Sequence, residues 1–558
     1  MTENFWKDKY PVGVAAEINP DQYLNILAVL KESCQRFADK PAFSNLGKTL
    51  TYGEMYKLSG DFAAYLQKHT GLKPGDRIAV QLPNVLQYPV VVFGALRAGL
   101  VVVNTNPLYT AREMEHQFND SGAKALVCLA NMAHLAESVL PKTGIRHVVV
   151  TEVGDLLPPL KRLLVNSVIK YVKKMVPAFH LPQAVKLNQA LAKGQGKAVR
   201  EASPAANDVA VLQYTGGTTG VSKGAVLLHR NIIANTLQCE AWFNPVLQAI
   251  RQSGEQVTSV CALPLYHIFA FTVNMMLSMH TGGKNILIPN PRDLAGTLKE
   301  LAKHKFHNFP AVNTLFNGLA HHPDFGSVDW SHLKVSVGGG MAVQGAVAKL
   351  WLEKTGCPIV EGYGLSETSP VVSCNPVTAK EFTGSIGVPL PSTYVKLVGD
   401  DGQTVTEPGK TGEIAVKGPQ VMEGYWQRPD ETAKSTTADG YFLTGDIGTI
   451  DERSFIKIVD RKKDMILVSG FNVYPNEVED VVAMCPGVLE CAVVGVPDEK
   501  SGEAVKLVVV KKDDSLTEEV LRKYCRENMT GYKQPRVIEF RTELPKTPVG
   551  KILRRELR

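Results

Sequence analysis

The sequence predicts an α/β protein with a large N-terminal domain of stacked αβ sheets, a β-rich subdomain and a small, mobile α+β C-terminal domain. Short apolar runs alternate with helical patterns over the first two thirds of the chain, which is typical of parallel sheets with helices on both faces. After about residue 385, shorter strand patterns are separated by Gly, Asp and Pro turns. The 558 residues also exceed what one core usually holds. We expect an N-terminal domain over residues 1–459, its β-rich subdomain over about 385–459, and a C-terminal domain over 460–558.

The individual elements follow from apolar runs and helical periodicity. The first strand–helix–strand unit is expected at residues 77–82, 86–98 and 100–104. The tail after residue 475 reads as helix, strand, strand, helix and strand. Further strands are expected at residues 125–129, 146–150, 209–213, 258–262, 285–288, 334–337, 394–398, 412–417, 455–459 and 465–468.

Composition and charge are those of an ordinary globular protein. Hydrophobic residues make up 44% and charged residues 21%, and the formal charge of +6 is too dilute over this length to indicate nucleic-acid binding. The nine cysteines form no CxxC pair or metal-type cluster, so we expect buried reduced thiols and a reducing compartment. Residues 1–11 lack an apolar run, so no signal peptide is expected. These features favour a cytoplasmic location and leave a homodimer open.

Residues 160–175 predict an amphipathic helix. Basic amphipathic helices can lie on anionic membranes, but ordinary surface helices also pack an apolar face on the core. We favour the ordinary surface helix and keep peripheral contact with the inner face of a membrane as the alternative. The apolar face holds Leu160, Leu163, Leu164, Val168, Tyr171, Val172 and Met175, and the other face holds Lys161, Arg162, Lys170, Lys173 and Lys174.

A phosphate-binding loop is predicted at residues 214–224, directly after an expected strand. The stretch YTGGTTGVSKG combines glycines, which allow a tight backbone turn, with hydroxyl donors and the cation Lys223. The order differs from the Walker A pattern, because Gly224 follows Lys223, so a P-loop NTPase is not expected. The loop donors are Thr215, Gly216, Gly217, Thr218, Thr219, Gly220 and Lys223.

Five motifs, in order, resemble those of the adenylate-forming superfamily of acyl-CoA synthetases, luciferases and peptide-synthetase adenylation domains. The resemblance covers nearly the whole chain, and around residues 460–477 it is similar to long-chain fatty-acid–CoA ligases in particular. It implies ATP-dependent activation of a carboxylic acid to an acyl-adenylate, followed by transfer to CoA, with Mg²⁺ as cofactor. The motifs are YTGGTTGVSKG at 214–224, YGLSET at 363–368, YFLTGD at 441–446, DRKKD at 460–464 and PKTPVGK at 545–551.

The resemblance also implies a role for each matched residue. Lys551 would bridge the carboxylate and the α-phosphate, and Glu367 with Thr218 would hold Mg²⁺. Asp446 and Arg461 would contact the ribose, while the C-terminal domain would turn about Asp460. Thr218, Glu367 and His267 are counted with Lys551 as catalytic candidates. Further ATP or AMP contacts are expected at Gly339, Gly340, Glu361, Gly362, Tyr363, Gly364 and Ser366.

The substrates are assigned to two further segments. An acyl pocket is expected from Tyr266, His267, Phe269, Phe271 and Val312, with His267 orienting the carboxylate and Phe271 in the place of an aromatic gate. The resemblance implies an aspartate near this segment in amino-acid-activating relatives, and none occurs between residues 263 and 271, which speaks against an amino-acid substrate. The CoA path would be lined by Ser469, Gly470 and Phe471.

Two alternatives stay open beside a long-chain fatty-acid–CoA ligase. One is an aryl- or medium-chain acyl-CoA ligase on the same fold. The other is a non-catalytic, membrane-associated protein that binds an acyl group or a nucleotide. The complete set of charged motif residues argues against the second.

Overall fold

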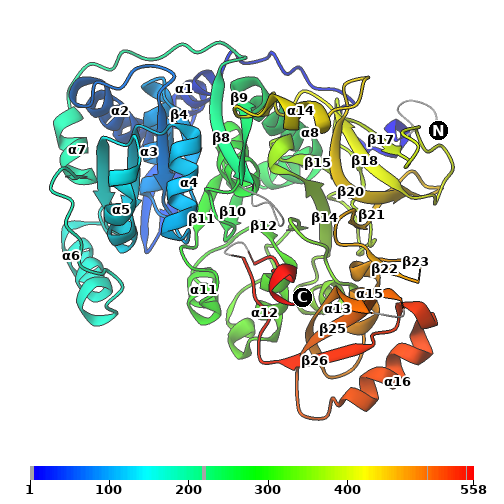
Figure 1. Ribbon diagram of the computed structural model, residues 1–558. Helices are drawn as coiled ribbons and strands as arrows, with labels where there is room; N and C mark the ends of the chain where they lie inside the picture. The colour runs from blue at the N-terminus through cyan, green and yellow to red at the C-terminus, as the bar shows by residue number, and fades with distance from the viewer. Residues whose placement is uncertain (1–5, 216–221, 470, 499–500, 548–549) are drawn as a thin grey trace.

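A computed structural model describes residues 6–215, 222–469, 471–498, 501–547 and 550–558. Figure 1 shows a large body of two sheets with their helices, a β-rich unit beside it and a separate C-terminal unit. The end of the chain runs back from that unit toward the middle of the molecule (Figure 1). This arrangement is the α/β architecture that the sequence predicts.

The first sheet has the order β19-β9-β8-β4-β3-β5-β6-β7. Its strands from β8 to β7 are parallel, and β9 returns antiparallel to β8. Ile78 and Val80 face a cluster with α2, α3 and α7, whereas Ala79 faces a cluster with α4 and α5. Helices therefore cover both faces. The strands are β3 (Arg77–Gln81), β4 (Val101–Asn104), β5 (Ala125–Leu129), β6 (His147–Thr151), β7 (Val185–Lys186), β8 (Val209–Thr215), β9 (Lys223–Leu228) and β19 (Gly424–Tyr425), and the helices are α2 (Tyr52–His69), α3 (Gln87–Arg97), α4 (Ala111–Ser121), α5 (Ala133–Val139) and α7 (Leu187–Gly194).

The second sheet has the order β16-β15-β14-β13-β12-β10-β11-β1-β2. Its middle strands, from β1 through β11, β10, β12 and β13 to β14, are parallel. The strands are β1 (Pro41–Asn45), β2 (Lys48–Thr51), β10 (Thr258–Cys261), β11 (Lys284–Leu287), β12 (Asn308–Ala311), β13 (Val335–Gly338), β14 (Ile359–Gly364), β15 (Val371–Cys374) and β16 (Val388–Pro389), and the accompanying helices are α1 (Ile26–Arg36), α8 (His229–Gln252), α9 (Ile268–Ala270), α10 (Leu277–Thr281), α11 (Leu294–Leu301), α12 (Asn313–His321) and α13 (Gly345–Thr355).

The two smaller sheets follow in the last third of the chain. The β-rich unit contains the antiparallel strands β17 (Tyr394–Val398), β18 (Gly412–Lys417), β20 (Phe442–Ile450) and β21 (Ile456–Arg461), with α14 (Pro429–Lys434) nearby. The C-terminal unit contains β22 (Ile466–Val468), β23 (Phe471–Val473), α15 (Pro475–Ala483), β24 (Val488–Asp498), β25 (Gly502–Lys511), α16 (Glu518–Asn528) and β26 (Val537–Arg541). The order helix, strand, strand, helix and strand in the tail is as predicted.

Most predicted strands are confirmed to within one or two residues. The bounds of β5, β17 and β18 agree with the prediction, because each is a run of alternating or continuous apolar residues bounded by turns. The strand predicted to end at residue 459 continues through Asp460 and Arg461 in β21, so the first two residues of the charged segment belong to a strand end. All nine cysteines are buried and free, as expected.

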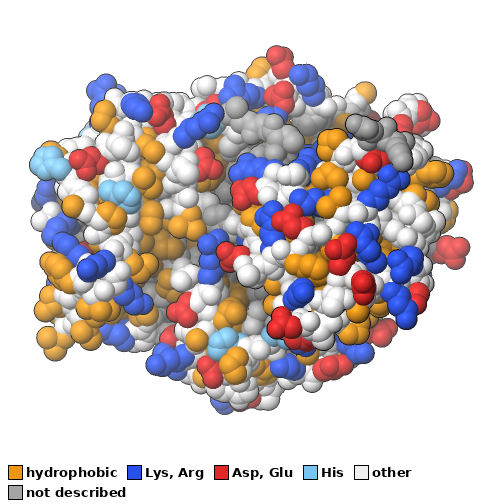
Figure 2. All heavy atoms as spheres, turned by 60° about the horizontal axis from the view of Figure 1, so that its bottom comes forward, with side chains coloured by type: hydrophobic (Ala, Val, Ile, Leu, Met, Phe, Trp, Pro, Cys, Tyr) orange, Lys and Arg blue, Asp and Glu red, His pale blue; other side chains and the backbone are white. Residues whose placement is uncertain are grey.

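The favoured interpretation of residues 160–175 is wrong. They form α6 (Pro159–Ser167), followed by a π-helical turn, η4 (Val168–Val172), and neither element has a buried residue. Leu160 is 85% exposed and Val172 is 74% exposed, so the apolar face is turned away from the core. In Figure 1 the helix projects at the lower left edge, and on that side Figure 2 shows hydrophobic side chains interleaved with lysine and arginine. Helical spacing identified the apolar face of the helix correctly, but it could not show whether that face contacts the core or solvent.

No helix of the described residues has both the length and the apolarity needed to span a bilayer.

Candidate active site

The flanks of the phosphate loop are set by the hairpin of β8 and β9. Thr215 and Lys223 are cross-strand partners in this antiparallel pair. Ser222 Oγ donates a hydrogen bond of 2.6 Å to the carbonyl oxygen of Thr215, which holds the two flanks together. The loop residues Gly216, Gly217, Thr218, Thr219 and Gly220 lie outside the described residues.

Lys223 is held by an acidic partner from a distant segment. Its Nζ forms an ion pair with Glu431 in α14 and lies 5.3 Å from the centre of the Tyr425 ring. Both partners come from the segment that follows the β-rich strand β18. A cation at this loop flank is therefore paired with a carboxylate that an anionic ligand would have to displace.

Glu367 is a nearly buried carboxylate that contacts the same Tyr425. It lies in a 3₁₀ turn, Ser366–Thr368, and is 9% exposed. The Tyr425 hydroxyl donates to Glu367 Oε1 at 2.8 Å. Burial raises the pKa of Glu367, while this hydrogen bond acts in the opposite direction. A buried carboxylate with a single hydroxyl partner suits a hard cation, which supplies the missing charge.

Tyr363, Asp446 and Arg461 form one polar cluster. The Tyr363 hydroxyl donates to Asp446 Oδ2 at 2.6 Å, and Arg461 Nε lies 3.2 Å from Asp446 Oδ1. Asp446 and Arg461 are register partners of β20 and β21, so the sheet itself sets their spacing. Three motifs separated in sequence thus meet at one point.

Two of the predicted glycines lie where a side chain would be crowded or strained. A Cβ at Gly364 would lie 2.0 Å from the carbonyl oxygen of Pro370, so no side chain fits there. Gly340 has φ +79°, and a Cβ there would face Lys551 Cε at 3.5 Å. Gly339 follows β13, and Glu361 and Gly362 belong to β14. Glu361 accepts a 2.9 Å hydrogen bond from the Val343 amide, and burial raises its pKa to about 8.

Lys551 reaches this site from the C-terminal unit. Two side chains of the large body bind its loop: Thr314 Oγ1 donates to the Gly550 carbonyl at 3.1 Å, and Arg292 donates to the Thr547 carbonyl at 3.2 Å. Burial lowers the pKa of Lys551 to about 8, Arg461 adds to this effect, and Asp446 and Glu367 oppose it. These charges act on Lys551 because the lysine lies among them.

His267 lies near Lys551 and caps the short helix α9. Its Nδ1 accepts a hydrogen bond from the Phe269 amide at 3.3 Å, so a neutral ring carries its proton on Nε2. Burial lowers the pKa of His267 to about 3, and the charge of Lys551 contributes. The ring is thus an uncharged donor at neutral pH.

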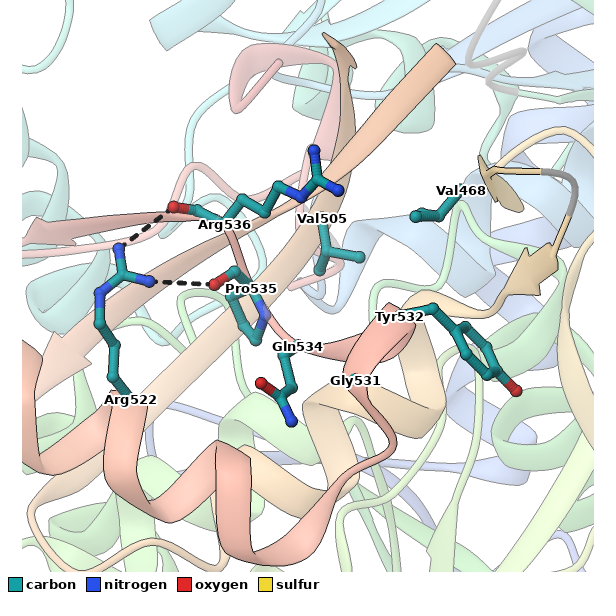
Figure 3. A pocket seen from close by; sticks show the side chains of 8 residues that line it. All are labelled: Val468, Val505, Arg522, Gly531, Tyr532, Gln534, Pro535 and Arg536. Atoms are coloured by element: carbon teal, nitrogen blue, oxygen red, sulfur yellow. Dashed lines mark hydrogen bonds between the residues drawn. The ribbon is translucent and has the colours of Figure 1, made fainter. Parts of the chain in front are cut away.

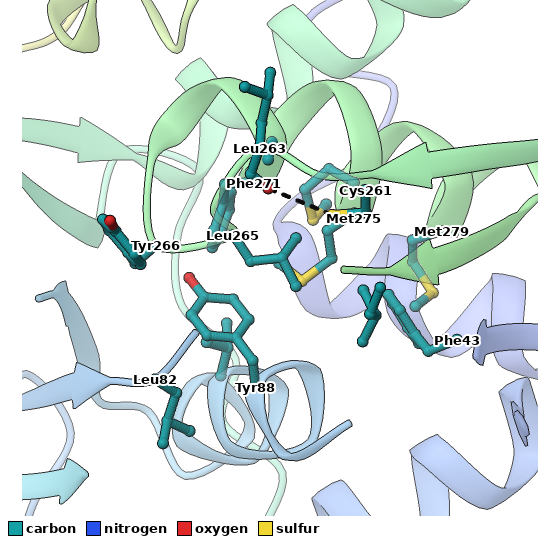
Figure 4. Close-up of a cluster of buried hydrophobic side chains, with 14 of the residues drawn as sticks. Phe43, Leu82, Tyr88, Cys261, Leu263, Leu265, Tyr266, Phe271, Met275 and Met279 are labelled. Carbon is teal, nitrogen blue, oxygen red and sulfur yellow. Dashed lines mark hydrogen bonds between the residues drawn. The ribbon is translucent and has the colours of Figure 1, made fainter. Parts of the chain in front are cut away.

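The predicted acyl residues line the start of a buried apolar region. Tyr266 and Val312 are buried, and Phe269 lies next to Gly339, where an added Cβ would meet its ring at 2.8 Å. Phe271 is fully buried and begins a π-helical segment, Phe271–Met276. In Figure 4 this segment leads from Tyr266 and Phe271 to Met275, and onward to Met279 beside Phe43.

Asp460 is completely buried at the end of β21. Its Oδ1 accepts from the Arg461 amide at 2.7 Å, and its Oδ2 accepts from the Asn476 amide at 2.9 Å. Burial raises its pKa to about 6, with Arg554 opposing the shift. The residue therefore joins β21 to the first turn of α15.

The residues expected for CoA are partly described. Ser469 has φ +50°, Gly470 lies outside the described residues, and Phe471 is 56% exposed. The Phe471 ring stacks on Tyr532, with centroids 4.7 Å apart. Tyr532 also borders a pocket of about 360 Å³ in the C-terminal unit, which Arg522, Gln534 and Arg536 line as well (Figure 3).

Motif reasoning missed several residues of the site. Tyr425 and Glu431 contact predicted site residues, and Arg292 and Thr314 contact the motif that contains Lys551, yet all four lie outside the five motifs. No local pattern marks them, since their contacts span from 58 to 255 positions along the chain. The assembled site combines a phosphate-loop flank, a carboxylate suited to a metal, a ribose-type carboxylate and a lysine from the C-terminal unit.

Comparison with known proteins agrees with this geometry. Residues 30–426 match the family model described as AMP-binding enzyme, and residues 477–551 match its C-terminal domain. A long-chain-fatty-acid–CoA ligase of Escherichia coli O157:H7 is 54% identical over 553 residues, covering 99% of this chain and 97% of its own. The ligase of that name from Yersinia pestis is 54% identical over 556 residues, covering 100% and 98%.

A solved structure extends the likeness to three dimensions. ATP-bound MatB from Rhodopseudomonas palustris is 28% identical, with a TM-score of 0.81, over 96% of this chain and 98% of its own. Family models matching both large segments, and relatives aligned over nearly the full length, lead to one conclusion. The chain belongs to the AMP-binding enzyme family.

Proposed function

We propose that the protein uses ATP to convert a long-chain fatty acid to acyl-AMP with release of pyrophosphate, and then transfers the acyl group to CoA. One observation carries the proposal: Lys551 of the C-terminal unit lies beside Gly340, which follows β13, and the charges of Arg461, Asp446 and Glu367 act on it there. The names of the 54% identical relatives support the acid and the acceptor.

In the first step, a carboxylate oxygen attacks the α-phosphorus of ATP, and the bond from that phosphorus to the bridging oxygen breaks. Two anions must approach each other, so a positioned cation lowers the barrier. Lys551 supplies this charge between the carboxylate and the α-phosphate. His267 donates from Nε2 to the carboxylate, and Asp446 with Arg461 holds the ribose.

Glu367, together with Thr218 of the loop, would hold Mg²⁺. The fit rests on the chemistry of Glu367, a nearly buried carboxylate whose pKa burial raises and whose partner Tyr425 donates only one hydrogen bond. When bound, Mg²⁺ neutralises charge on the phosphate oxygens. Lys223, released from Glu431, adds a second positive charge on the outer phosphates.

In the second step, the CoA sulfur attacks the acyl carbon, the bond to AMP breaks, and the thiol proton passes to solvent. Lys551 occupies the site during the first step, so the C-terminal domain must turn to admit CoA, and we place the hinge at Asp460. Ser469, Gly470 and Phe471 would then line the thiol path. The adjacent pocket is lined by Arg522 and Arg536, which pair with Glu518 and Asp498, so the phosphates of a nucleotide there would compete with these carboxylates.

The long acyl chain would follow the buried segment beyond Phe271. From His267 to Met279 the chain advances twelve positions, and a helical rise makes this roughly 15–18 Å. Methionines are flexible and repack readily, so Met275 and Met279 can yield to an apolar chain. This depth favours a long acid over an aryl acid.

The test is acid-dependent pyrophosphate release with CoA present and absent. We expect one equivalent of pyrophosphate without CoA, continuous turnover with CoA, and the highest kcat/KM for long saturated acids. Higher kcat/KM for benzoate-type or medium-chain acids would favour the alternative ligase. No acid-dependent pyrophosphate with any acid would favour the non-catalytic binding protein and contradict the proposal.

We also propose that the exposed face of α6 and η4 docks on the anionic inner surface of a membrane. Exposed Leu160, Leu163, Leu164, Tyr171 and Val172 can enter the acyl boundary, while the neighbouring lysines meet lipid phosphates. Long-chain acids partition into membranes, so such docking would bring the enzyme to its substrate. The notable apolar exposure of this segment supports the proposal, because exposed apolar patches mark interaction surfaces.

Liposome sedimentation tests the docking. Changing Lys170, Lys173 and Lys174 to Glu should weaken binding to anionic vesicles but leave activity on micellar acid intact. The matched control changes Lys142, Lys410 and Lys523, which are 63%, 62% and 72% exposed elsewhere, to Glu. Equal binding by the two triple variants would contradict docking through α6 and η4.

A further inference from the structure

The segment after Lys551 is tied back to the hinge by Arg554. Arg554 Nη2 donates to Glu479 Oε1 and Oε2 at 2.9 and 2.8 Å, and Arg554 Nε reaches Glu479 Oε1 at 3.3 Å. The same Nη2 donates to Asn476 Oδ1 at 2.7 Å. Both partners lie in α15, the first helix after the hinge.

The other side of the guanidinium faces the hinge strand. Arg554 Nη1 lies 3.7 Å from Asp460 Oδ1 and 3.9 Å from Asp464 Oδ2. Asp460 is fully buried, and the Arg554 side chain is only 21% exposed. Arg558, four positions later, pairs with Asp464 at 2.9 Å. A charged cluster this enclosed depends on all its partners, because an unpaired buried charge is costly.

Arg554 lies close to Lys551 along the chain. It follows Lys551 by three positions, at the start of the 3₁₀ turn Arg554–Glu556. The Lys551 loop is closed by the backbone bond from the Leu553 amide to the Pro545 carbonyl, at 2.8 Å, and Leu557 is buried in an apolar cluster of the C-terminal unit. Any displacement of Arg554 is therefore transmitted to Lys551.

We propose that Arg554 is a positioning residue that couples the hinge at Asp460 to the placement of Lys551 for adenylation. The inference rests on the proposed function, since it assumes that Lys551 acts in the first step. Arg554 binds both α15 and Asp460, so it makes the Lys551 loop move with the C-terminal domain as one body. The planar guanidinium is needed because it binds Glu479 through two nitrogens while facing Asp460 with a third.

The test separates the two half-reactions. Arg554→Lys keeps the charge but loses the fork geometry, and Arg555→Lys is the matched control, because the neighbouring Arg555 is exposed. Single-turnover pyrophosphate release without CoA should fall about 10- to 100-fold in Arg554→Lys, the range expected for a misplaced catalytic group. Thioester formation from synthetic acyl-AMP and CoA should stay at the wild-type rate in Arg554→Lys. In Arg555→Lys, both half-reactions should proceed at the wild-type rate.

A second variant tests the contact from its other side. Glu479→Gln should slow adenylation, and combining it with Arg554→Lys should add less than the sum of the two single effects. Equal losses in both half-reactions, or additive effects, would show a merely structural role and overturn the inference. If wild-type enzyme forms acyl-AMP but Arg554→Lys matches it, only the inference fails. If the wild type forms none, the proposed function fails.

Discussion

The hydroxyl of Tyr425 donates a hydrogen bond to Glu367 Oε1 at 2.8 Å, across 58 positions of sequence. Glu367 is the proposed metal ligand, and Tyr425 also lies under the Lys223 ammonium group. One tyrosine outside the motifs thus contacts both charged groups of the phosphate region. The effect of Tyr425 on Glu367 and on Lys223 can be measured.

Removing the hydroxyl in Tyr425→Phe should weaken magnesium binding, so that the enzyme needs a higher Mg²⁺ concentration. The hydrogen bond opposes the rise that burial imposes on the pKa of Glu367, so its loss favours the neutral acid, which binds a cation poorly. Because the lost hydrogen bond is one to a charged group, the Mg²⁺ concentration for half-maximal rate should rise about tenfold. A Mg²⁺ titration of pyrophosphate release measures it, with Tyr524→Phe in α16 as control. An unchanged titration would remove Glu367 from the metal site.

Adenylation should decline as the pH rises above about 8. Burial lowers the pKa of Lys551 to about 8, so the side chain is a cation below this value and loses its proton as the pH passes through it. Because kcat/KM reports the free enzyme, kcat/KM for ATP should follow this loss. Lys551→Arg stays charged, so its residual rate should lack the alkaline decline. A wild-type profile that rises steadily through pH 9 would contradict the role of the charge.

Glu431→Gln should lower the KM for ATP. Glu431 pairs with Lys223, and the phosphates must displace this carboxylate before Lys223 can bind them. Because the pair is partly exposed, the effect should be only about two- to fivefold and should shrink in high salt. The control is Glu452→Gln, at an exposed turn. A raised KM would mean that Glu431 supports the nucleotide directly.

Met279→Phe should shift acid preference toward shorter chains. Met279 is 1% exposed in α10, beside Phe43 at the far end of the buried segment (Figure 4). A larger, stiffer side chain there should lower kcat/KM for the longest acids at least about tenfold, as apolar pockets discriminate by single methylenes. A saturated-acid series compares it with Met484→Phe, a change at a 53% exposed position. Parallel profiles would place the acyl tail elsewhere.

Local patterns predicted the elements well and their partners poorly. Apolar periodicity is a short-range property, so it marked β5, β17 and β18 at their observed bounds. It also identified the apolar face of residues 160–175, but the exposure of Leu160 depends on what surrounds the helix. The π-helical turn beginning at Phe271 has no signal in residue spacing.

The site shows the same limit. Motif resemblance named Tyr363, Asp446 and Arg461 as nucleotide contacts because each lies in a contiguous motif, and the structure joins them in one cluster. Tyr425 and Arg554 escaped, since their importance lies in long-range contacts made by ordinary side chains. Such contacts become visible only once the sheets have been assembled.

The most direct test of the account is Lys551→Ala in the two half-reactions measured separately. Removing one positioned charge in an enclosed site should slow acid-dependent pyrophosphate release by about 100-fold or more. Thioester formation from synthetic acyl-AMP and CoA should proceed at the wild-type rate, because Lys551 has left the site by then. Adenylation at the wild-type rate in Lys551→Ala would contradict the account.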